Sequence, residues 1–124
     1  MPTHDAAQAA NLATYRKTLE AAGGSSVPAR PWQHSKQPLS DGELVRLAAW
    51  KADDHQVAPE VVIAGLGLLE SARAELDQVE AGLLFAARAS GLTFQQIASA
   101  LGLGSGQAAQ QRMSRVLARL DSSS

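Results

Sequence analysis

The stretch Gly91–Arg115, GLTFQQIASALGLGSGQAAQQRMSR, decides the fold of the C-terminal part of the chain. Thr93 precedes a short apolar-periodic segment and is a suitable N-cap for a helix of about two turns. The buried face of that helix is predicted to hold Phe94, Ile97, Ala98 and Leu101. Gly102 follows, where a glycine ends a helix by adopting a positive φ, and Ser105 is placed to cap the next helix. The sequence therefore predicts helices over 93–101 and 105–120, with Leu103 packed into the core at the turn.

The second of these helices divides into faces with different chemistry. Its inward face is predicted to hold Ala109, Met113, Val116, Leu117 and Leu120, and its outward face Gln107, Gln111, Ser114 and Ala118. Arg112, Arg115 and Arg119 are spaced three and four residues apart, so they stack along one flank. Such a flank is suited to phosphate contact, although three arginines on a helix are also common on a merely solvated face.

This pattern resembles the helix-turn-helix of bacterial regulators and of the promoter-reading end of sigma factors. The matching stretches are 97–103 and 112–120. More closely, residues 76–112, about a third of the chain, resemble small actinobacterial DNA-binding proteins with an LGLGSRQAAEQR-type segment. This chain has Gly106 and Gln110 where that pattern has Arg and Glu. The resemblance implies that the second helix enters the major groove of double-stranded DNA.

The residue types allow roles to be predicted for this DNA contact. Glutamine can bond adenine N6 and N7 in a bidentate way, which makes Gln107, Gln110 and Gln111 the candidates for reading bases. Thr93 and Ser105 are expected near phosphates. The complete set predicted to contact DNA is Thr93, Gln95, Ser105, Gln107, Gln110, Gln111, Arg112, Ser114, Arg115 and Arg119.

Two further helices are predicted upstream. Ser40 and Glu43 fit a capping box that begins a helix over 40–52. Pro59 suits the first turn of a long helix over 59–89, whose apolar residues recur at heptad spacing, although two glycines within it allow a break. That seam predicts a homodimer with a core of Leu66, Leu69, Leu76, Val79 and Leu83. The alternative is that the helices cover one another within a single chain.

The N-terminal third has a different composition. Residues 1–38 are predicted to form a helix or arm from Asp5 to about Ala22, followed by a flexible linker rich in Gly and Pro. The DNA-binding domain is then expected over 39–124. Trp32 and Trp50 are predicted to be packing anchors, and the chain as a whole is predicted to be all-α.

Composition narrows the function. The 124 residues carry 11 Lys and Arg against 12 Asp and Glu, but the acids gather in the middle and residues 88–120 contain none. The chain has no cysteine, and His4, His34 and His55 are scattered, so neither a metal site nor a cofactor is expected. Asp53, Asp54 and His55 lack a nucleophile at a recognisable spacing, and no enzyme activity is predicted.

The location and partners follow as expectations. Without a secretory signal or a run of about 18 apolar residues, the chain is expected to be cytoplasmic and to avoid membranes. The sequence predicts a DNA-binding transcriptional regulator. The alternative is a protein-interaction adaptor that docks on RNA polymerase or another regulator through the acidic helix 59–89.

Overall fold

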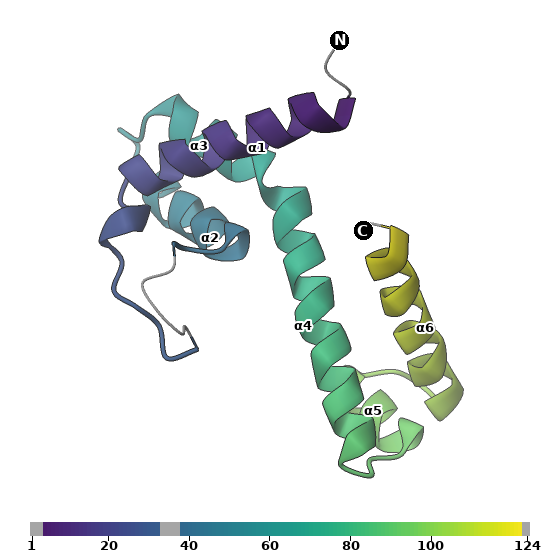
Figure 1. Ribbon diagram of the computed structural model, residues 1–124. Helices are drawn as coiled ribbons and strands as arrows, with labels where there is room; N and C mark the ends of the chain where they lie inside the picture. Colours follow the sequence, from purple (N-terminus) through teal and green to yellow (C-terminus); the bar gives the residue numbers. More distant parts are fainter. Residues whose placement is uncertain (1–3, 33–37, 123–124) are drawn as a thin grey trace. The chain divides into compact units, whose positions relative to one another are not determined.

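The computed structural model describes residues 4–32 and 38–122, and within these it contains only helices (Figure 1). The predicted all-α class is confirmed. Of the histidines considered as metal ligands, His34 lies outside the described residues. None of the described helices is both long and apolar enough to cross a membrane. Packing divides the chain into two compact units, Met1–Arg73 and Ala74–Ser124, so the boundary predicted at residue 38 falls inside unit 1.

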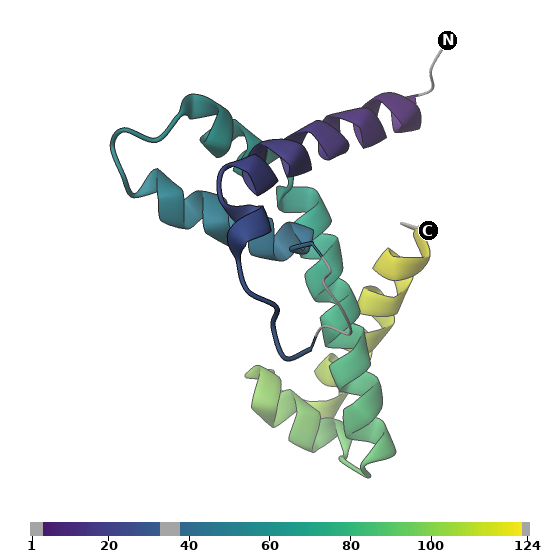
Figure 2. The same cartoon turned by 60° about the vertical axis from the view of Figure 1, so that its left-hand side comes forward.

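Unit 1 is a helical cluster formed by the N-terminal half of the chain. It contains α1 (His4–Ala21), the 3₁₀ helix η1 (Gly24–Ser26), α2 (Asp41–Ala52), α3 (Pro59–Gly67) and the start of α4 (Leu69–Ala89). Its buried core consists of Leu19, Leu39, Leu44, Ala48, Val61, Ala64 and Leu68. The helix predicted to belong to an arm is therefore packed into a core through Leu19, which is fully buried. Figure 2 shows α1 from a second direction.

The prediction that the two tryptophans anchor the packing is wrong. Trp32 is 72% exposed and Trp50 is 73% exposed. The core face of α2 is set by Leu44 and Ala48, and Trp50 lies two residues beyond that face, which at 100° per residue turns it toward solvent.

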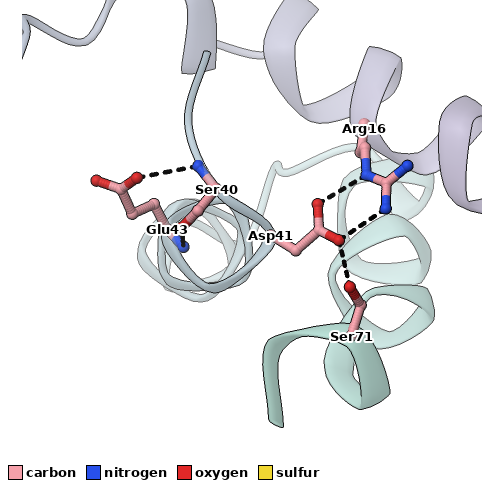
Figure 3. Close-up of polar contacts among 5 residues, drawn as sticks. All are labelled: Arg16, Ser40, Asp41, Glu43 and Ser71. Carbon is pink, nitrogen blue, oxygen red and sulfur yellow. Dashed lines mark hydrogen bonds and ion pairs between the residues drawn. The ribbon is translucent and has the colours of Figure 1, made fainter. Parts of the chain in front are cut away.

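The capping box that begins α2 is confirmed (Figure 3). The Glu43 amide donates to Ser40 Oγ at 3.2 Å, and the Ser40 amide donates to Glu43 Oε1 at 2.9 Å. The next residue, Asp41, links three helices. Arg16 of α1 donates to its two carboxylate oxygens at 2.7 and 2.9 Å, and the Ser71 hydroxyl of α4 donates to the same carboxylate. The Arg16 hydrogen bonds hold the pKa of Asp41 below its usual value, against the opposing effect of burial.

The single helix predicted over 59–89 is wrong, because the chain breaks at Leu68 between α3 and α4. Leu68 has φ −97° and ψ 0° and is fully buried. Gly67, the last residue of α3, lies against α1: a Cβ at this residue would come within 2.4 Å of the Tyr15 ring, so only glycine lets α1 pass this close. The break also splits the predicted heptad seam, and Leu66 and Leu69 line a shallow apolar groove within unit 1.

Unit 2 consists of the rest of α4 with α5 (Phe94–Leu101) and α6 (Gly106–Ser122). Leu84 of α4, Ile97 and Ala98 of α5 and Ala109 of α6 form its buried cluster. Ile97, Ala98 and Ala109 are small or branched, so α5 and α6 can approach closely where they cross. This contact holds α5 and α6 against each other, and these two helices form the segment that is predicted to bind DNA.

Candidate nucleic-acid interface

The caps predicted for α5 are present at both ends. Thr93 Oγ1 accepts a hydrogen bond from the Gln96 amide at 3.1 Å, and Gln96 Oε1 accepts one from the Thr93 amide at 2.8 Å. The prediction of Thr93 as N-cap is confirmed, with Gln96 as a reciprocal partner that was not predicted. Gly102 has φ 73° and ends the helix in the left-handed conformation. The Leu103 amide then donates back to the Ala98 carbonyl at 2.8 Å.

The start of α6 is held by two side chains. Ser105 Oγ accepts from the Ala108 amide at 3.1 Å, as predicted for a cap. Gln95 Oε1 accepts from the Gly106 amide at 3.2 Å, so this side chain from α5 satisfies an amide at the N-terminus of α6. Gln95 is predicted to contact DNA, and the structure places it as a brace between the two helices.

The buried face predicted for α5 is correct except at its last residue. Ile97 and Ala98 are buried and Phe94 is partly buried, but Leu101 is 36% exposed. The turn at Gly102 explains the difference, because it directs the next residue, Leu103, against the cluster that Leu101 was expected to fill.

The predicted faces of α6 are confirmed. Ala109 and Val116 are fully buried, and the other inward residues are partly buried. The side chains predicted to face outward are exposed; these are Gln107, Gln111, Ser114 and Ala118. One open hollow on this helix is lined by Gln107, Gln110, Gln111, Ser114 and Arg115. Five of the predicted DNA-contacting residues therefore share one accessible surface.

The three predicted flank arginines are in different environments. Arg112 donates to both carboxylate oxygens of Glu80 on α4, at 2.8 and 3.3 Å, and Arg119 donates to Asp77 at 3.2 Å. The hydrogen bond to Glu80 raises the pKa of Arg112. Arg115 is exposed and has no ion-pair partner among residues 4–32 and 38–122. The freely presented cation on α6 is thus Arg115, while Arg112 and Arg119 connect α6 to α4.

Glu80 and Asp77 were not predicted to be the partners of Arg112 and Arg119. Glu80 lies 32 residues from Arg112, and Asp77 lies 42 residues from Arg119. No rule of local helix spacing relates positions so far apart. Only the packing of α6 beside α4 within unit 2 brings the charges together.

The histidines and acids do not gather into a metal site. Within the described ranges, no group of three or more His, Asp or Glu side chains is placed to hold an ion. Comparison with family models, with curated proteins and with solved structures finds no match to this chain.

Proposed function

We propose that the chain is a DNA-binding transcriptional regulator in which α5, the turn at 102–105 and α6 act as a helix-turn-helix. The N-terminal half of α6 would enter the major groove. The observation that carries this proposal is the hollow lined by three glutamines, Ser114 and Arg115, which are the residues expected to read bases and hold a phosphate. The segment 106–120 contains no carboxylate that would repel the DNA backbone.

The chemistry divides between these side chains. The glutamine amides both donate and accept, so Gln107, Gln110 and Gln111 can distinguish base pairs in the major groove. Arg115 would supply the main phosphate contact of α6, because the guanidinium groups of Arg112 and Arg119 are already paired with acids. Each neutralised phosphate contributes about −0.9 to the slope of log affinity against log salt. We therefore expect a shallower salt dependence than three phosphate-binding arginines would produce.

Replacing Arg115 with alanine should weaken DNA binding about tenfold at low salt, on the order of one lost phosphate contact. The loss should be similar for all sequences and should reduce the salt slope by about 1. Fluorescence anisotropy with a duplex selected from a random pool by the wild-type chain measures both quantities. Arg73→Ala is the matched control, since it removes an exposed arginine of unit 1. Equal losses in the two variants would contradict a contact at α6.

Glu80→Gln should have the opposite effect on DNA binding. It removes the negative charge that holds Arg112, whose guanidinium then becomes available to a phosphate. Affinity for any duplex should rise at low salt, and the salt slope should become steeper by about 1. Glu70→Gln provides the control, because Glu70 pairs with an exposed arginine outside unit 2. An unchanged slope in a variant of wild-type helicity would show that Arg112 does not reach DNA.

The adaptor function receives less support. Two acids of the predicted docking helix, Asp77 and Glu80, are paired with arginines and so present less free negative charge to a partner. Folded protein that fails to bind any duplex at low salt would reject the DNA proposal. Protein-partner capture that then depends on Glu60 and Glu70 would favour the adaptor instead.

A further inference from the structure

Within unit 2, α4 carries apolar residues on two faces. One face holds the buried residues Ala81 and Leu84, and Leu84 belongs to the cluster formed with α5 and α6. The other face presents Leu76, Val79 and Leu83, which are 65%, 53% and 67% exposed. Three large aliphatic side chains this exposed along one helix mark an interaction surface rather than scattered surface residues.

The spacing of the exposed apolar residues along α4 indicates which kind of partner packs against them. Leu76, Val79 and Leu83 are followed by the exposed Ala86, at steps of three, four and three residues. This is the repeat with which one helix packs against another helix of the same pattern. We propose that this outward face of α4 pairs with the same face of a second copy of the chain, with the two helices antiparallel.

Charge supports a second copy as the occupant. A two-fold contact brings like residues near each other, so an unpaired charge beside the seam would repel its own equivalent. The seam residues are all uncharged. The adjacent carboxylates of Glu80 and Asp77 are each neutralised by an arginine of α6. The ion pairs that tie α6 to α4 therefore also remove the repulsion that would oppose self-association.

Side-chain size favours the antiparallel direction. A parallel, in-register pair would set each seam residue opposite its own equivalent, so that Leu76 would face Leu76 and Ala86 would face Ala86. An antiparallel pair centred between Val79 and Leu83 sets Val79 opposite Leu83 of the second copy. It also sets Leu76 opposite Ala86, so that a large side chain meets a small one. The antiparallel direction therefore distributes side-chain volume more evenly along the seam than the parallel direction does.

The first test is the mass of the full chain in solution, measured by sedimentation equilibrium without DNA. We expect a concentration-dependent dimer of twice the 13.0 kDa chain mass. Leu83→Glu should be monomeric with unchanged helicity, because Leu83 is largely solvent-exposed in the single chain. Trp50→Glu, a substitution of similar exposure in unit 1, should remain dimeric. A monomeric wild type, or a dimer unaffected by Leu83→Glu, would overturn the proposal.

The second test determines the direction of the pair. The chain has no cysteine, so introduced thiols are the only ones present. The L76C/A86C double variant should form intermolecular disulfides on oxidation. L76C alone should not, because its equivalent would lie ten residues, or about 15 Å, away along the helix. Cross-linking of L76C alone would overturn the antiparallel arrangement. Both tests are made without DNA, so their failure is independent of any failure to bind a duplex.

Discussion

Replacing Gly67 with alanine is expected to lower the free energy of unfolding of unit 1 by about 1–3 kcal/mol. An added Cβ would lie 2.4 and 2.5 Å from two carbons of the Tyr15 ring, so the ring must leave its place against α3. Alanine is ordinarily the better helix former by about 1 kcal/mol, but this gain is smaller than the cost of displacing a packed aromatic ring. Steric overlap therefore outweighs the gain in helix propensity, and Gly67→Ala lowers the free energy of unfolding.

Gly82→Ala is the matched control, because it makes the same chemical change within a helix. A Cβ at Gly82 has no neighbour within 4 Å, so this variant should be stabilised by about 0.5–1 kcal/mol. Urea unfolding followed by tryptophan fluorescence and by far-ultraviolet circular dichroism separates the units, since both tryptophans, Trp32 and Trp50, belong to unit 1. Stabilisation by Gly67→Ala would mean that α1 does not approach α3 as closely as described.

Asp41→Asn is expected to destabilise unit 1 by about 1.5–3 kcal/mol at neutral pH, as is typical when a hydrogen bond to a charged group is lost. The carboxylate is only 12% exposed and accepts hydrogen bonds from Arg16 and Ser71, so it joins α1, α2 and α4. Asparagine preserves the shape but cannot bind the guanidinium through two acceptors. It also removes the negative charge from the first turn of α2.

This effect should depend on pH in a definite direction. The pKa of Asp41 is lower in the folded chain than in the unfolded chain, where it is about 3.9. The stabilisation is therefore complete above the unfolded pKa and is lost as the pH falls through the folded pKa. Wild type and Asp41→Asn should differ fully at pH 7 and converge as the pH falls through the lowered pKa of Asp41 in the folded chain. Urea midpoints measured across this range test the expectation.

Glu70→Gln is the control for the Asp41 substitution. It removes the ion pair with Arg73, in which both side chains are exposed, at 85% and 67%, so it should change stability by less than about 0.5 kcal/mol at any of these pH values. If Glu70→Gln and Asp41→Asn showed the same loss at pH 7, the Asp41 network would be no more important than an ordinary surface pair.

The sequence by itself determined the features that depend on neighbouring residues. The helix starts at Ser40 and Thr93, the helix end at Gly102 and the two faces of α6 all follow from caps, positive φ and the 3.6-residue period. These rules act over one or two turns of helix, so no knowledge of the rest of the chain was needed. The same local rules predicted which polar side chains of α6 would be exposed.

Only the tertiary structure decided the features that depend on distant residues. The close approach of Tyr15 to Gly67 requires α1 to pack against α3, and the pairing of Arg112 with Glu80 requires α6 to lie beside α4. Trp50 was expected to anchor the packing because it ends an amphipathic helix, but its position relative to the core face of α2 places it outside. Steric contact and charge pairing both act through space, and the sequence does not state which distant residues share that space.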